Sequence, residues 1–194
     1  MRTLFITAVA ALTLVTGCSK KAKYIDPAAR SKVEGTGIEA RDVQVVVAEM
    51  SEALIGALQI TGSESPPRVA VMPVENRSRF LIDQEIFTTL ITDELINNAS
   101  GRIAIVNRDR LDDILAERQR KAQGQVSDDG HLQALAGVDW FLDGEIRSLS
   151  ASSNKAQTDY VVIRFELTNA ETGIVAWSNS YEMKKQGGWG VMYQ

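Results

Sequence analysis

Few residues of this chain combine the type and the spacing that catalysis needs. His131 is the only histidine and could act as a general base. It lies in the first turn of an expected short helix, where a solvated surface histidine is the simpler interpretation. The pairs Asp112-Asp113 and Asp128-Asp129 are sequence neighbours, so on a helix their side chains point about 100° apart and do not converge on one substrate. They suit a helix N-terminus, which favours negative charge.

The motifs of common enzyme classes are absent from the sequence. The chain carries neither a Gly-x-Ser-x-Gly nucleophile motif nor a phosphate-binding glycine loop. The glycine-rich run 187–190 follows the last expected strand and opens no helix, which indicates a tail with a partner contact as the alternative. One histidine and one cysteine do not provide a zinc-type ligand set. We therefore expect a non-enzymatic protein with no metal and no cofactor.

The one cysteine follows an N-terminal leader. Arg2 is positive, Leu4–Val15 is apolar apart from two threonines, and Val15-Thr16-Gly17 places small residues directly before Cys18. This pattern is typical of a bacterial lipoprotein signal. The alternative is a buried thiol behind an ordinary signal peptide. We expect residues 1–17 to be removed and Cys18 to be lipidated, with each buried CH₂ group contributing about 0.8 kcal/mol to anchoring.

Residues 18–41 are expected to form the lipidated N-terminus and a flexible tether. Ser19 follows the cysteine, and a residue other than aspartate there favours sorting to the outer membrane by the usual bacterial tendency. Fully extended, Ser19–Arg41 would reach about 75–80 Å. The net charge of −4, with no basic run longer than Lys20-Lys21, argues against nucleic acid as a partner.

The strongest strand pattern begins at Val138. Val138–Ile146 alternates apolar residues with acidic ones, and Tyr160–Leu167 puts Val161, Ile163, Phe165 and Leu167 on one face. Asn169–Gly173 predicts a tight reversal in which Gly173 can supply a positive φ. The next strand, Ile174–Tyr181, carries Trp177. Three such strands predict a sheet with one buried face, which helices must cover.

The earlier part of the chain supplies the remaining elements. The first is a helix capped by Asp42, with an apolar stripe of Val43, Val46, Val47, Met50, Ala53, Leu54, Ala57 and Leu58. A buried strand over Arg68–Val74 follows, and then a helix with Ile86, Phe87, Leu90, Ile91 and Leu95 on one side. We next expect a short strand over Ile103–Val106, a helix from Leu111 with a projecting polar end, and a short helix capped by Ser127 or Asp128 with Leu132, Leu135 and Ala136 inward. The sequence therefore predicts one α/β domain over residues 42–185, with a mixed sheet of about five strands flanked by helices, and a tail over 186–194.

A polar segment after the buried strand is the best candidate for a binding site. Glu75–Arg79 contains Asn76 and exposes Arg77 and Arg79 from a loop with a rigid base. Arginine is favoured at interfaces for its planar, multidentate guanidinium. We expect these residues to contact an acidic patch on a partner. The alternative is that both arginines only cap helices or pair with nearby carboxylates.

Several stretches together resemble a known family. They are Val69–Ser78, the helix that ends at Leu95-Ile96-Asn97-Asn98, Ala136–Leu142, and Glu171–Ser178 with its Thr-Gly turn before a Trp-Ser pair. With the lipoprotein signal, they resemble the outer-membrane lipoproteins of the LpoB type that activate penicillin-binding proteins, within a group that shares an N-terminal-TolB-like fold. The resemblance covers roughly residues 36–185.

This resemblance implies a role without catalysis. Such a domain docks on a small accessory domain of a bifunctional peptidoglycan synthase of the inner membrane and stimulates polymerisation and crosslinking of glycan. This chain lacks the long proline-rich arm of the best-known pattern. A second hypothesis from the wider fold group is a structural component of an envelope assembly or secretion complex, which would typically need an amphipathic membrane-spanning β segment.

Overall fold

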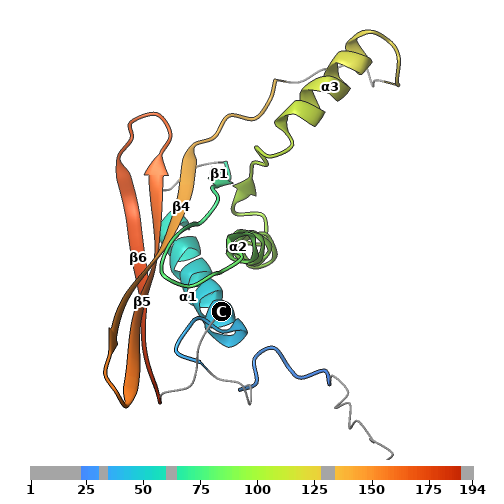
Figure 1. Cartoon of the computed structure of the whole chain (residues 1–194). Helices are drawn as coiled ribbons and strands as arrows, with labels where there is room; N and C mark the ends of the chain where they lie inside the picture. Colours follow the sequence, from blue (N-terminus) through green and yellow to red (C-terminus); the bar gives the residue numbers. More distant parts are fainter. Residues whose placement is uncertain (1–22, 31–34, 60–64, 128–133, 189–194) are drawn as a thin grey trace, which may run out of the picture.

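The computed structural model describes residues 23–30, 35–59, 65–127 and 134–188. The chain forms helix α1 (Ala40–Gln59), strands β1 (Arg68–Val71) and β2 (Glu75–Arg77), helix α2 (Gln84–Asn98), strand β3 (Ala104–Ile105), helix α3 (Leu111–Ala122), and strands β4 (Trp140–Ser152), β5 (Ala156–Asn169) and β6 (Val175–Gly188). Figure 1 shows α1 and α2 beside the sheet and α3 projecting away from the body. The predicted single α/β domain is confirmed.

In the described part of the chain the sheet is mixed and has six strands, where the sequence predicted about five. Its order is β3-β1-β4-β5-β6, with β2 paired to β4 beyond the end of β1. The pairs of β1 with β3 and with β4, and of β2 with β4, are parallel. The pairs β4–β5 and β5–β6 are antiparallel. Parallel strands joined through helices therefore come first along the chain, and a meander of long strands completes the sheet.

The core lies between the inner face of the sheet and helices α1 and α2. The predicted alternation of β5 is confirmed, because Val161, Ile163, Phe165 and Leu167 are all at most 2% exposed. The apolar stripe of α1 is buried as expected, and α2 buries Phe87, Ile91 and Leu95. These side chains form the core cluster with Leu142 and Ile146 of β4.

Gly144 allows the side chains of Phe165 and Val74 to pack closely against β4. It lies opposite Phe165 in the β4–β5 ladder. A Cβ atom at Gly144 would come within 2.7 Å of the Phe165 ring and 3.0 Å of a Val74 methyl group. The Phe165 ring thus fills the space that a side chain at position 144 would occupy. Glycine is needed there because the ring lies so close to the β4 backbone.

The turn between β5 and β6 has the predicted form. Gly173 has a φ of +70°, in the left-handed region that favours glycine. The Asn169 side-chain oxygen accepts hydrogen bonds from the backbone N–H groups of Glu171 and Thr172 at 3.0 and 2.8 Å. Asn169 N–H donates to the Ile174 carbonyl at 2.9 Å, which closes the hairpin.

Several sequence-based boundaries were wrong. β4, β5 and β6 run further than predicted, and β6 continues to Gly188, into the segment expected as a tail. Helix α1 begins at Ala40, so Asp42 is not its cap; the Asp42 carboxylate instead accepts the Glu39 N–H at 2.8 Å. In α2, Ile86 and Leu90 are 48% and 36% exposed, although their spacing predicted a buried side.

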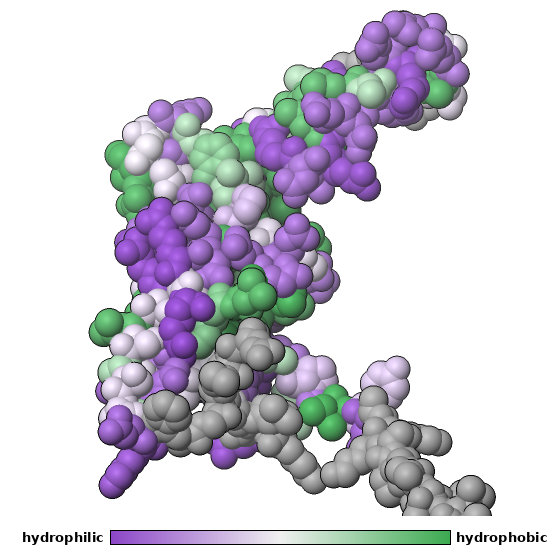
Figure 2. All heavy atoms as spheres, viewed as in Figure 1, coloured by the Kyte–Doolittle hydropathy of each residue, from purple (hydrophilic) through white to green (hydrophobic). Residues whose placement is uncertain are grey.

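The region between α3 and β4 also differs from the prediction. No residue of α3 is buried, so the whole helix projects and not only its polar end. Figure 2 shows apolar and polar residues on different sides of this helix. Of the expected short helix from Ser127 or Asp128, residues 128–133 lie outside the described part; residues 134–138 are not helical, and Leu135 is 39% exposed.

Candidate functional site

The segment proposed from sequence as a binding loop is partly a strand. Glu75–Arg77 forms β2 and pairs in parallel with Glu145–Arg147 of β4. The loop prediction was wrong for these three residues. They show no apolar alternation, which is the sequence signal for a strand, but their backbone groups still pair with β4. Val74, directly before β2, is 1% exposed and fixes the segment to the core.

Asn76 shapes the chain after β2. Its side-chain nitrogen donates to the Phe80 carbonyl oxygen at 2.8 Å. Its side-chain oxygen accepts from the Ser78 backbone N–H at 2.9 Å and from the Ser78 hydroxyl at 2.6 Å. These are the local side-chain-to-backbone bonds that asparagine makes in turns. Asn76 therefore holds the turn closed with both ends of its amide.

Arg79 is held by a buried carboxylate. Its Nε and Nη2 atoms donate to the two oxygens of Asp159 at 2.8 and 2.6 Å. Asp159 is 0% exposed, whereas the Arg79 side chain is 40% exposed. The guanidinium also lies 4.7 Å from the centroid of the Phe80 ring, a cation–π distance. The planar, bidentate geometry fixes the arginine against the sheet.

Asp159 gathers further donors around its carboxylate. The Ser150 hydroxyl donates to Oδ1 and the Gln157 side-chain nitrogen donates to Oδ2 at 2.9 Å. Burial alone would raise the pKa of Asp159, but the hydrogen bonds from Arg79, Ser150 and Gln157 outweigh it and hold that pKa well below its ordinary value. Asp159 is thus a buried, charged carboxylate on the inner face of β5 that accepts hydrogen bonds from three side chains.

Arg77 is the cation of the segment that faces solvent without a buried partner. Its guanidinium pairs with Glu75 at 2.8 Å, and both side chains are more than half exposed. The Arg77 hydrogen bond lowers the pKa of Glu75. Arg147, opposite Arg77 in the ladder, pairs with Glu145 at 3.1 Å. The two strands therefore present two parallel carboxylate–guanidinium pairs side by side.

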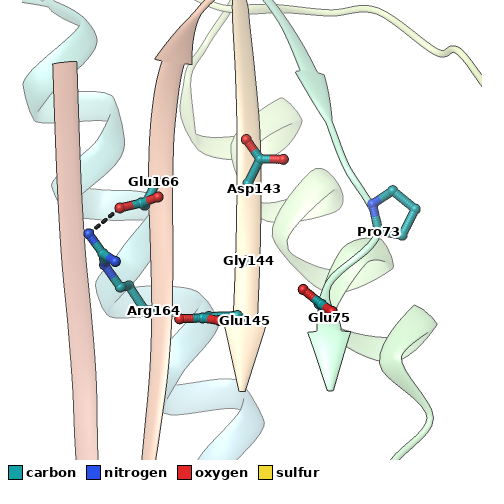
Figure 3. Close-up of a pocket in the computed structure, with 7 residues that line it drawn as sticks. All are labelled: Pro73, Glu75, Asp143, Gly144, Glu145, Arg164 and Glu166. Carbon is teal, nitrogen blue, oxygen red and sulfur yellow. Dashed lines mark ion pairs between the residues drawn. The ribbon is translucent and has the colours of Figure 1, made fainter. Parts of the chain in front are cut away.

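A shallow hollow of about 230 Å³ adjoins this charged pattern. It is lined by Pro73, Glu75, Asp143, Gly144, Glu145, Arg164 and Glu166. Figure 3 shows Arg164 ion-paired with Glu166 of the same strand, with the helices behind the strands. Burial, and then the Glu166 charge, raise the pKa of Asp143. The hollow and β2 together give this face a dense, ordered set of charges suited to recognition of another protein.

The end of the expected tether is packed on the domain. Thr36 is 3% exposed and lies against Gly187 of β6. The Lys185 ammonium donates to the Gly37 carbonyl at 3.0 Å and to the Asp42 carboxylate at 2.5 Å. Residues 35–39 were expected to be flexible because they show no hydrophobic period. These residues are attached to the domain through Thr36, Gly37 and Lys185. Such contacts leave no periodic pattern in the sequence.

The remaining sequence-predicted residues fall outside or apart from this site. Cys18 and His131 lie outside the described residues. Asp112 and Asp113 occupy the first turn of α3, as predicted, and Asp113 pairs with Arg110 at 2.9 Å. Within the described ranges, no helix is long and apolar enough to cross a bilayer, and no cluster of three or more histidine, cysteine or acidic residues is placed to hold a metal ion.

The chain is similar to several solved structures. The C-terminal domain of LpoB from Escherichia coli shares 18% identity, with a TM-score of 0.47, over 73% of this chain and 98% of that chain. The same domain from Salmonella enterica shares 20% identity, with a TM-score of 0.42, over 73% and 94%. Lipoprotein GNA1162 from Neisseria meningitidis shares 15% identity, with a TM-score of 0.37, over 64% and 85%.

No curated protein matches the chain in a comparison of sequences. The sequence model that describes the peptidoglycan-synthase activator LpoB does match it, over residues 42–183, which include nearly all of α1 and of the sheet. That match covers most of the 194 residues. The chain belongs to the LpoB family of peptidoglycan-synthase activators.

Proposed function

We propose that this protein is a lipoprotein of the outer membrane that binds a bifunctional penicillin-binding protein from the periplasmic side and activates it without itself being an enzyme. The family match over residues 42–183 carries the proposal. The domain contributes a charged face on a rigid sheet, and Cys18 contributes the lipid anchor.

In this proposal, Asn76, Arg77 and Arg79 form the partner-binding segment with unequal roles. Asn76 closes the turn and Arg79 fixes it to Asp159, so both act mainly by holding the segment in place. Arg77 is 52% exposed and makes the direct contact with an acidic patch on the synthase. Its pair with Glu75 is exposed to water, so exchanging that carboxylate for one of the partner costs little.

The tether sets how far the domain reaches from the membrane. Residues 35–39 are attached to the domain through Thr36 and Lys185, which leaves residues 19–34 as the span between anchor and domain. Fully extended, that span covers at most about 50–60 Å. The proposal therefore requires the accessory domain of the synthase to come within this distance, plus the width of the folded domain, of the outer membrane.

Binding and activation can be tested with one charge reversal. Arg77→Glu should weaken binding to the cognate synthase by about 2 kcal/mol, roughly 30-fold, and more strongly at low salt, because it places like charges at the contact. Surface plasmon resonance at two salt concentrations measures affinity, and a glycan polymerisation assay measures activation. Candidate bifunctional penicillin-binding proteins serve as the immobilised partner.

Arg120→Glu is the matched control for this experiment. Arg120 lies on the projecting helix α3, is 54% exposed and pairs with a neighbouring glutamate, as Arg77 does. Its reversal should leave affinity and activation unchanged. Binding of the Arg77→Glu protein that equals the wild type at both salt concentrations would move the interface away from β2. Absence of binding and stimulation by the wild type for every candidate synthase would overturn the function itself.

A further inference from the structure

Strand β6 forms one edge of the sheet. It pairs with β5 on one side, and no strand of the described residues pairs with its other side. With 14 residues it is far longer than the usual strand of about 5–6. An open edge of this length presents a row of backbone N–H and C=O groups that another strand can pair with.

Proline and bulges, two of the features that normally prevent edge pairing, are missing from most of β6, and its charged residues are Glu182, Lys184 and Lys185. The strand contains no proline, and the only break in its pairing with β5 lies opposite Leu167 and Thr168, near its start. An inward-pointing charge can also protect an edge, but the inward Lys185 is satisfied by Asp42 and the Gly37 carbonyl. From Ser178 onward the strand is regular, and its outer edge is free to pair with another strand.

The charges of β6 select one pairing register. Glu182 and Lys184 project from the same face on either side of Met183. An antiparallel second β6 centred on Met183 places each Glu182 opposite the Lys184 of the other copy. Centring on Glu182 or on Lys184 would place identical charges opposite each other, which is unfavourable. A slip of one residue would turn the inner face of the added strand outward.

We propose that β6 pairs antiparallel with β6 of a second copy of this chain, about a two-fold axis at Met183, to form one continuous sheet through both molecules. Ser178 then lies opposite Gly188 of the second copy. The axis runs perpendicular to the sheet, so both copies keep their helices on the same side and the contact is self-complementary. A single added strand is a small interface, which makes the pairing reversible.

Site-directed crosslinking tests the register directly. Met183→Cys in the full-length protein should crosslink to a dimer with a short bismaleimide, because residues at the axis face each other at about 4.5–5.5 Å between Cα atoms. Asn179→Cys is the matched control on the same strand and face. In this register its two copies lie about 27 Å apart and should not crosslink. The unsubstituted chain, whose only cysteine is Cys18, sets the background.

A charge exchange separates pairing from misfolding. In the Met183→Cys protein, Glu182→Lys or Lys184→Glu alone should reduce crosslinking about tenfold, because two like-charge pairs replace two ion pairs. The double exchange restores opposite charges and should restore crosslinking. Crosslinking of Met183→Cys at background level, equal crosslinking of Asn179→Cys, or a double exchange that fails to restore the dimer would each overturn the proposal.

Discussion

The Arg79 guanidinium and the Asp159 carboxylate are joined by two hydrogen bonds, of 2.8 and 2.6 Å, across the edge of the core. The carboxylate is fully buried, so removal of its cation leaves a charge without its main partner. We expect Arg79→Ala to lower the free energy of unfolding by about 3 kcal/mol. Urea denaturation measures this loss.

The contrasting variant is Arg77→Ala. Arg77 pairs with Glu75 where both side chains are mostly exposed, so its loss should change stability by only about 0–1 kcal/mol. Equal stability losses in the two variants would show that Asp159 does not depend on Arg79.

The low pKa of Asp159 predicts a specific acid dependence. A carboxyl whose pKa is lower in the folded than in the unfolded state stabilises the fold above its unfolded value, about 3.9, and this stabilisation is lost as pH falls further. The melting midpoint of the wild type should therefore fall more steeply below about pH 4 than that of Asp159→Asn. Thermal scans from neutral to acidic pH measure both curves; parallel curves would contradict the prediction.

The ionised carboxylate of Asp143 should destabilise the fold, in contrast to that of Asp159. Its pKa is raised by burial and by the Glu166 charge, so keeping it ionised costs stability at neutral pH. Asp143→Asn should raise the melting midpoint slightly at pH 7. The gain should vanish in acid, where the wild-type carboxyl is also neutral. Differential scanning fluorimetry across pH measures this difference, and a neutral-pH loss of stability would contradict it.

Gly144→Ala should destabilise the fold by about 1–3 kcal/mol, because its methyl group would lie 2.7 Å from a Phe165 ring atom within the core. Gly56→Ala is the matched control, since nothing lies within 4 Å of the added atom and the site is helical. That change should stabilise by about 0.5–1 kcal/mol. Guanidinium denaturation midpoints compare the two; a neutral Gly144→Ala would mean that Phe165 can move.

The proposed lipidation of Cys18 has its own test. Cys18→Ser should abolish incorporation of a palmitate analogue and leave the precursor unprocessed, because the signal Val15-Thr16-Gly17 would precede a residue that cannot form the thioether. Metabolic labelling followed by gel analysis measures both effects. Label retained at the wild-type level would place the modification elsewhere.

The sequence predicted those parts of the fold in which apolar periodicity decides the structure. The stripe of α1 and the alternation from Val161 to Leu167 placed the main core correctly. Periodicity failed for polar strands. Glu75–Arg77 and the ends of β4 and β6 pair through their backbones and carry mostly polar side chains, which suggested loops.

The binding role of Asn76, Arg77 and Arg79 stays a prediction. The position of their segment directly after a buried strand was predicted correctly, but the carboxylate that holds Arg79 was missed because Asp159 is charged. One signal was present: Asp159 lies two residues before Val161, so the period of the strand already placed it on the buried face. The Arg79–Asp159 pair joins residues 80 positions apart, and a single sequence does not reveal such a contact.

The packed end of the tether connects the N-terminal segment to the candidate binding segment through only a few contacts. With the proposed anchoring through Cys18, tension from the membrane would arrive at Thr36 and Gly37, which β6 holds through Gly187 and Lys185. Gln157, opposite Gly187 in the ladder, donates to Asp159, the carboxylate that holds Arg79. A pull between anchor and partner would therefore cross the sheet laterally through backbone bonds and ion pairs.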